Sequence, residues 1–240
     1  AVAESSRNIN EKGLYLGFIA KPHRYVTFTS YFDRFEFPWM RYQADAPSNG
    51  HEFMSQLNYK PSKKLEMYFR IRKRNRPKNT PEDIPDIDFI VAQTQINYRY
   101  QISYKISDAI RLKNRVEYTE FQLGDEPVEQ GFLIYQDIAY KALSKPWSLN
   151  FRYALFESDT YNSRIYAYES DVLYAFSIPA YAYRGTRTYL TFRYTIRRGV
   201  DLWLRYGQWF YNNRDIVGSG LTEIQGNSKS EFKAQLRLKF

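Results

Sequence analysis

Polar and apolar residues alternate one by one along most of the chain, which predicts strands and not helices. The stretch EFKAQLRLKF places Phe232, Ala234, Leu236, Leu238 and Phe240 on one side and polar or basic residues on the other. Successive side chains of a strand point to opposite faces, so this segment has one apolar and one polar face. We therefore expect an apolar environment on one side of this strand.

The longest alternating stretch is AQTQINYRYQISYKI, residues 92–106. Ordinary strands have about 5 or 6 residues, whereas a tilted strand that crosses a bilayer needs about 9 to 11. The same pattern recurs along the chain and predicts eleven strands. We expect them at about 13–20, 25–35, 51–60, 64–74, 92–106, 110–121, 131–142, 148–157, 186–197, 200–211 and 231–240.

The connections between these strands alternate between short and long. The short ones are at 21–23, 61–64, 107–109, 143–147 and 197–199, and the long ones at 36–50, 75–91, 122–130, 158–185 and 212–230. This alternation is typical of a transmembrane β-barrel with short periplasmic turns and long extracellular loops. Inside 158–185, the stretch RIYAYESDVLYAFS is strand-like and predicts a protruding hairpin.

A soluble antiparallel barrel or sandwich would also alternate. Aromatic residues, however, make up 18% of the chain, with 23 Tyr and 17 Phe. They gather toward strand ends, as do Tyr98 with Tyr104 and Tyr206 with Phe210, which is typical of interfacial aromatic girdles. The sequence therefore favours an all-β, antiparallel transmembrane β-barrel that spans residues 1–240 without a separate soluble domain.

Strand direction adds a further expectation. If the last strand runs toward the periplasm, the first one, GLYLGFIA, runs inward from an extracellular start. Single-chain bacterial barrels have an even number of strands, whereas this chain supplies about 11 to 12 with eleven clearly patterned. We expect further strands, from upstream of residue 1 or from a partner chain, to complete a larger barrel.

The formal net charge is +9 and the pI about 9.4, which suits nucleic acid, anionic solutes or an anionic lipid surface. Basic residues take the polar sides of the strands, where they avoid the cost of about 2 to 4 kcal/mol for a lipid-facing Arg at the bilayer midplane. An open lumen lined this way favours anions, whereas a closed one pairs its charges with acids or with a plug. The predicted basic lumen wall is Arg70, Arg72, Arg99, Lys105, Arg111, Lys113, Arg115, Arg152, Arg193, Arg205, Lys233 and Arg237.

Two smaller sets of residues carry expectations of their own. The inward carboxylates of Glu66, Glu117, Asp137 and Asp201 are expected to neutralise neighbouring Arg side chains. The terminal strand resembles the signal that the outer-membrane assembly machinery recognises. Its expected members are Phe232, Leu236, Leu238 and Phe240.

Residues for catalysis are scarce. The chain has no Cys, and its two His residues, His23 and His51, are expected at opposite ends of the strands. No nucleotide-binding motif occurs. We therefore predict no enzyme, no catalytic residue, no metal and no cofactor. The basic run RKRNRPK, residues 72–78, is expected either as a solvated loop or as a contact for lipopolysaccharide phosphates or nucleic acid.

Several stretches resemble the outer-membrane helix-hairpin-helix domain proteins of Bacteroidota. They are NEKGLYLGF (10–18) and the segments 35–72, 163–179 and 215–240. The resemblance is to the C-terminal barrel portion of that family. It implies an N-terminal helix-hairpin-helix module elsewhere, and any contact with DNA rests on this analogy.

Together these patterns predict an outer-membrane barrel of a Gram-negative bacterium, acting as a channel or as a component of an envelope transport or assembly complex. The alternatives are a non-conducting structural subunit and a DNA-uptake receptor. The expected partners are outer-membrane lipid, lipopolysaccharide, the completing strands and other outer-membrane proteins, with nucleic acid by family analogy alone.

Overall fold

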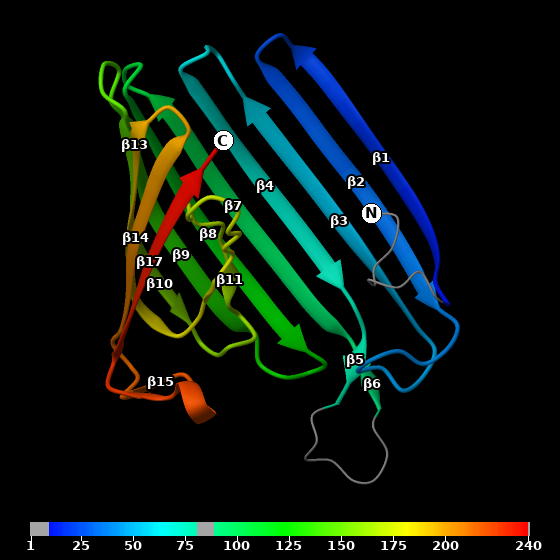
Figure 1. Cartoon of the computed structure of the whole chain (residues 1–240). Coiled ribbons are helices and arrows are strands. Elements are labelled where there is room, and N and C mark those ends of the chain that lie inside the picture. Colours follow the sequence, from blue (N-terminus) through cyan, green and yellow to red (C-terminus); the bar gives the residue numbers. More distant parts are fainter. Residues whose placement is uncertain (1–9, 81–88, 240) are drawn as a thin grey trace.

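Eleven long antiparallel strands form one sheet in the computed structural model, which describes residues 10–80 and 89–239 (Figure 1). Each strand pairs with the next long strand along the chain, in the order β1-β2-β3-β4-β7-β8-β9-β10-β13-β14-β17. They are β1 (Lys12–His23), β2 (Val26–Phe37), β3 (Ser48–Tyr59), β4 (Leu65–Asn75), β7 (Gln93–Lys105), β8 (Ile110–Leu123), β9 (Glu129–Lys141), β10 (Trp147–Ser158), β13 (Arg184–Arg197), β14 (Val200–Tyr211) and β17 (Ser228–Leu238).

Short ribbons and one helical turn complete the secondary structure. β5 (Lys78–Asn79) pairs with β6 (Ile90–Val91), β11 (Ile165–Tyr166) with β12 (Ala180–Tyr181), and β15 (Ile216–Val217) with β16 (Ile224–Gln225). A 3-10 turn covers Gly220–Thr222. Within residues 10–80 and 89–239, no helix has the length and apolar character that a bilayer crossing requires.

The all-β antiparallel fold predicted from the alternation is confirmed. The expected strand 92–106 is β7, and the other strands begin and end within three residues of their expected positions. The short turns lie at one end of the sheet and the long connections at the other (Figure 1). Each long strand has 11 to 14 residues, enough to cross a bilayer at a tilt.

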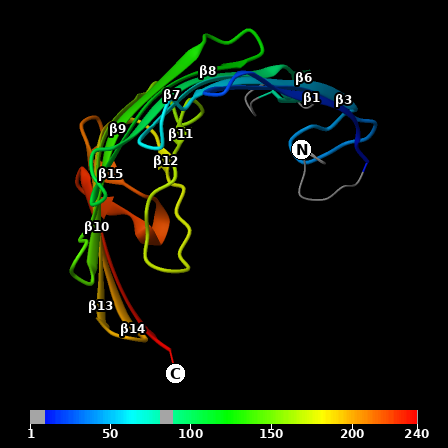
Figure 2. The ribbon, with the colours of Figure 1, turned by 90° about the horizontal axis from the view of Figure 1, so that it is seen from above.

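Seen along the strands, the sheet curves into a trough with one concave and one convex face (Figure 2). β1 and β17 form its two edges, and in the described part of the chain these two strands do not pair with each other. The observed sheet is therefore an open, barrel-like wall.

The two faces of this wall differ in chemistry because the register keeps polar residues opposite polar residues. Arg70 lies opposite Arg99, Arg99 opposite Glu117, and Asp137 opposite Arg152, all on the concave face. The convex face carries large, exposed apolar side chains. They include Phe69, Tyr100, Tyr104, Phe132, Ile134, Ile138, Tyr153, Leu155, Leu190, Tyr194, Tyr206, Phe210, Phe232, Leu236 and Leu238.

The connection between β10 and β13, residues 159–183, folds back onto the concave face (Figure 2). We call it the inner segment. The strand-like stretch does form a hairpin, since β11 pairs with β12 and Glu169 bridges to Ser177. The prediction that this hairpin protrudes is wrong, because it lies inside the curve of the sheet. Two kinds of contact stabilise the segment on the concave face. Its Ile165, Ala167 and Tyr181 are buried in an apolar cluster with concave residues such as Leu133 and Phe156, and its acids meet buried arginines, as described below.

Candidate functional site

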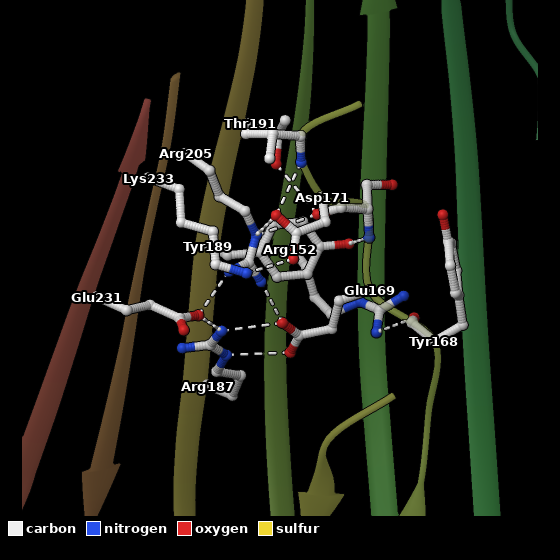
Figure 3. A network of polar contacts seen from close by, with 12 residues as sticks. Arg152, Tyr168, Glu169, Asp171, Arg187, Tyr189, Thr191, Arg205, Glu231 and Lys233 are labelled. Atoms are coloured by element: carbon white, nitrogen blue, oxygen red, sulfur yellow. Dashed lines mark hydrogen bonds and ion pairs between the residues drawn. The ribbon is translucent and has the colours of Figure 1, made fainter. Parts of the chain in front are cut away.

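The inner segment is fastened to the sheet through the buried carboxylate of Glu169 (Figure 3). Arg187 of β13 donates to both carboxylate oxygens, from Nε at 3.0 Å and from Nη2 at 2.8 Å. Arg205 of β14 donates a further hydrogen bond to Oε2, and the Tyr181 hydroxyl donates to Oε1 at 2.7 Å. The side chains of Glu169 and Arg205 are both 0% exposed. Glu169 is therefore held by four hydrogen bonds from three side chains and is withdrawn from solvent.

The residues beside Glu169 are held as well, and we call residues 168–171 the latch. The Tyr168 carbonyl accepts from Arg152 at 2.8 Å, and the Ser170 carbonyl accepts from Arg205 Nε at 3.1 Å. The Asp171 carboxylate accepts from Lys233 of β17 at 2.6 Å. Because the donors come from β10, β14 and β17, the latch connects strands that are not all neighbours in the sheet.

Further acids complete the charge balance around the latch. Glu231 of β17 accepts from Arg205 Nη1 at 2.5 Å and also from Arg187. Asp137 of β9 binds Arg152 through two hydrogen bonds of 2.5 and 2.8 Å. Four cationic side chains thus form ion pairs with four carboxylates. The cations are Arg152, Arg187, Arg205 and Lys233, and the carboxylates are those of Asp137, Glu169, Asp171 and Glu231. Each carboxylate of the latch region therefore has a cationic partner, and Asp137 has a second one in Lys113 at 2.9 Å.

Aromatic rings pack around these guanidinium groups. Arg152 lies 3.7 Å from the ring centre of Tyr135, and Arg187 lies 4.6 Å from that of Trp209. Burial raises the pKa of Tyr181 well above its usual value, and the Glu169 carboxylate adds to this effect. The Tyr181 phenol therefore stays protonated and remains a donor to Glu169.

Two glycines on the concave face make room for the inner segment. A Cβ on Gly131 of β9 would lie 2.0 Å from the carbonyl oxygen of Ser163, so only glycine allows this approach of two backbones. A Cβ on Gly207 of β14 would lie 2.8 Å from Arg187 nitrogens and from a Glu231 oxygen. Both positions therefore leave space that the docked segment and its ion pairs occupy.

The other half of the trough holds a basic cavity of about 450 Å³ between the inner segment and strands β4, β7 and β8. Six of its lining residues are cationic and one is a carboxylate. The lining residues are Gln43, Arg70, Arg72, Arg74, Lys78, Gln93, Gln95, Asn97, Arg99, Glu117, Phe121, Leu123, Asn162, Arg164, Ile165 and Tyr166. Arg99 binds Glu117, and Arg72 and Arg74 bind Glu52 beside the lining, so the cavity and its paired acids still hold more cations than carboxylates.

The twelve residues of the predicted basic wall all lie on the concave face, as the strand register requires. They separate into several groups. Arg152, Arg205 and Lys233 belong to the latch region, whereas Arg70, Arg72 and Arg99 line the basic cavity. Arg193 and Arg237 bind Asp201, Arg115 lies near Glu117, and Lys113 binds Asp137. Lys105 pairs with Asp108 at a short turn, and Arg111 is exposed near the same turn.

The inward acids differ in their partners. Glu117 binds Arg99 through two hydrogen bonds of 2.7 Å, and Asp137 and Asp201 each bind arginine. Glu66 instead lies 3.1 Å from the exposed Lys60. Three of the four acids therefore neutralise arginines of the concave face, and the fourth pairs with a lysine near a turn.

Sequence reasoning missed four residues of the latch region: Arg187, Glu169, Asp171 and Glu231. Arg187 could have been found, because it alternates in step with Arg193 along β13, and Glu231 alternates in step with Lys233 along β17. Glu169 and Asp171 lie outside the long strands, where alternation gives no direction to a side chain. Their role became visible only in the folded chain.

The remaining predicted residues take simpler positions. Phe232, Leu236 and Leu238 lie exposed on β17, and Phe240 lies outside the described residues. His23 ends β1 at a short turn, whereas His51 lies in β3 near a long connection, so the two are at opposite ends of the sheet. Across the described residues, no group of three or more His, Asp or Glu side chains could hold a metal ion.

Comparisons with known proteins give matches among solved structures alone. No protein-family model and no curated protein matches the sequence. Among solved structures, the chain is similar to OmpT (in-vitro folded), an outer membrane protein of Vibrio cholerae, with a TM-score of 0.47 and 13% sequence identity. The match covers 88% of this chain and 63% of that one, so the chain spans less than two thirds of the solved protein.

Proposed function

We propose that this chain forms the wall of an outer-membrane β-barrel whose lumen is narrowed by the inner segment, and that the barrel passes anionic solutes. The concave face is the lumen wall, and the convex face meets lipid. The long connections are extracellular and the short turns periplasmic. The assignment of the two faces rests on the placement of charge and apolar surface over the sheet, and that of the two ends on the lengths of the connections.

The convex surface supports the membrane location. Phe69, Tyr100, Ile134 and Leu190 come from four different strands, and each exposes more than a third of its surface. A water-soluble protein rarely exposes a continuous apolar surface of this extent, whereas a barrel in a bilayer needs an outward apolar band. Lipid is therefore the environment that suits this face.

The latch is the observation that supports a lumen narrowed by the inner segment. A loop that lies on the lumen wall by chance would be held by exposed, weak ion pairs of about 0 to 1 kcal/mol. Here Glu169, Arg187 and Arg205 are withdrawn from solvent and bonded to one another. Removal of one partner from a buried pair of this kind costs about 3 to 5 kcal/mol. The docked position of the segment is thus strongly preferred.

Planar-bilayer recordings on the full-length protein test this function. In a KCl gradient the reversal potential should indicate preference for chloride, since the lumen wall is basic. Glu169→Gln should raise the mean conductance by loosening the inner segment. The matched control is Glu157→Gln, because Glu157 is exposed and lies 3.9 Å from its partner Arg184. Absence of conductance in both the wild type and Glu169→Gln would exclude a channel.

A structural subunit that conducts nothing is the second candidate. The buried contact of Glu169 with Arg187 and Arg205 favours it, because such a contact holds the inner segment against the wall as a plug. A DNA-uptake receptor rests on the family resemblance alone, and its test is the loss of DNA uptake when the gene is deleted.

A further inference from the structure

We propose that the basic cavity is a binding site for a soluble, multivalent oxyanion, with phosphate groups as the preferred chemistry. The proposal deepens the proposed function, since it names the class of solute that the lumen would hold. It rests on two cationic side chains of the lining, Arg70 and Arg164, for which the described residues supply no carboxylate partner.

Arg70 is the first of these side chains. It lies directly opposite Arg99 on the neighbouring strand, an arrangement that is unfavourable for like charges. Arg99 has Glu117 as a partner, but Arg70 donates only to the neutral Gln56 at 2.6 Å and lies against the Tyr68 ring. Within the described residues, Arg70 has no carboxylate partner. An anion in the cavity would relieve this repulsion.

Arg164 brings a second uncompensated charge from the opposite side of the cavity. It belongs to the inner segment, where it donates to the Tyr166 hydroxyl at 2.7 Å and to the Tyr161 carbonyl at 2.5 Å. Its guanidinium lies 4.2 Å from the ring centre of Tyr161. In the part of the chain that the structure describes, no carboxylate pairs with Arg164. Hydrogen bonds to neutral oxygens thus hold the group in place without cancelling its charge.

The basic run 72–78 adds three cationic side chains to the lining, and one carboxylate of the sheet offsets part of their charge. Arg72 and Arg74 alternate onto the concave face, and Lys78 follows at the start of β5. The Glu52 carboxylate accepts two hydrogen bonds from Arg72, at 2.9 and 2.6 Å, and lies 3.5 Å from Arg74 Nε. The run is therefore neither a free loop nor a patch on the outer surface. Three of its residues, Arg72, Arg74 and Lys78, line the cavity.

The form of the cavity fits a small oxyanion with several charges. Its volume of about 450 Å³ lies in the usual range for small-molecule sites. Guanidinium groups present paired N–H donors that match phosphate oxygens. Cations on two facing walls suit a ligand with at least two phosphate groups. Because lipid meets the convex face, the occupant of this concave cavity comes from solution.

Titration calorimetry on the full-length protein in detergent tests the site with sodium tripolyphosphate as the probe. We expect binding that weakens with added salt, as charge screening requires. Arg70→Gln and Arg164→Gln should each weaken binding about tenfold, the loss typical of one charge-assisted hydrogen bond. Lys63→Gln is the matched control, because Lys63 is exposed in the turn between β3 and β4. Citrate and maltotriose serve as comparison ligands.

Tripolyphosphate binding that is tighter than citrate binding and sensitive to both arginine substitutions would support the proposal. Equal affinity for citrate would overturn the preference for phosphate. No binding to the wild type, or binding unchanged in both arginine variants, would overturn the site itself. If the protein conducts ions but does not bind tripolyphosphate, the channel is supported and the binding site is refuted. If it binds tripolyphosphate but does not conduct, the binding site is supported and the channel is refuted.

Discussion

Glu169 of the inner segment and Arg205 of β14 form an ion pair in which neither side chain is exposed to solvent. The pair joins an irregular connection to the middle of a long strand, and Arg187 and Tyr181 complete it. Substitution of Glu169 by Gln would leave two buried guanidinium groups short of a partner. We expect the docked segment to lose about 3 to 5 kcal/mol of stability.

Hydrogen exchange measures this loss directly. Amides of residues 165–181 should exchange faster in Glu169→Gln than in the wild type, while amides of β7 should not change. Glu157→Gln should leave both regions as they are. Unchanged protection of 165–181 in Glu169→Gln would contradict the role of the latch.

Gly131→Ala should loosen the start of the inner segment, because the new Cβ would lie 2.0 Å from the Ser163 carbonyl oxygen. Neither backbone can move away without breaking the docking. The measurement is limited proteolysis within 159–183, which should become faster. Gly17→Ala is a suitable control, because its Cβ would meet only the ring of the exposed Tyr15, at 3.0 Å. Equal cleavage rates in the two variants would count against this close approach.

Ion pairs on the concave face should contribute differently to the free energy of unfolding, depending on how deeply they are buried. Asp137→Asn leaves the fully buried Arg152 without its carboxylate, and we expect a loss of about 3 to 5 kcal/mol. Asp108→Asn removes a pair at an exposed turn, where water screens the charges and we expect little change in stability. Urea unfolding of the full-length protein in lipid vesicles compares the two. Similar midpoints for both variants would argue against a closed environment around Arg152.

Neighbouring positions of β7 should tolerate charge very differently. Ile102 belongs to the apolar convex row and Ser103 to the polar concave row of this strand. Ile102→Arg should hinder insertion by about 2 to 4 kcal/mol if it lies near the bilayer midplane, whereas Ser103→Arg should insert nearly as the wild type does. The folded fraction in lipid vesicles, measured by heat-modifiable migration in gels, gives the comparison. A larger folded fraction for Ile102→Arg than for Ser103→Arg would contradict the assignment of the convex face to lipid.

The strands could be predicted from the sequence because their information is local. In β7, every second residue from Thr94 to Tyr104 is apolar, aromatic or β-branched, and this period alone fixes the strand and its two faces. The inward row that includes Arg152 and Arg205 followed from the same rule. The same alternation places Arg187 on the concave face, but it does not reveal that Glu169 is its partner.

The inner segment could not be predicted because its position depends on contacts between residues far apart in the chain. The apolar and aromatic residues around Glu169 are equally compatible with a hairpin that projects into water. The segment instead folds inward because Arg187, Arg205 and Lys233 come together only when β13, β14 and β17 are already paired. Neither the spacing nor the composition of 159–183 contains that information.

The latch also has a mechanical consequence for the curved sheet. Through Arg152, Arg187, Arg205 and Lys233 it is attached to β10, β13, β14 and β17, so it acts as a crossbar on the inside of the curve. Flattening this part of the wall would pull those four attachment points apart. Strands β1 to β4 have no such crossbar among the contacts of the latch. The wall is therefore stiffened on one side, and bending motions should concentrate in the half that lies farther from the inner segment.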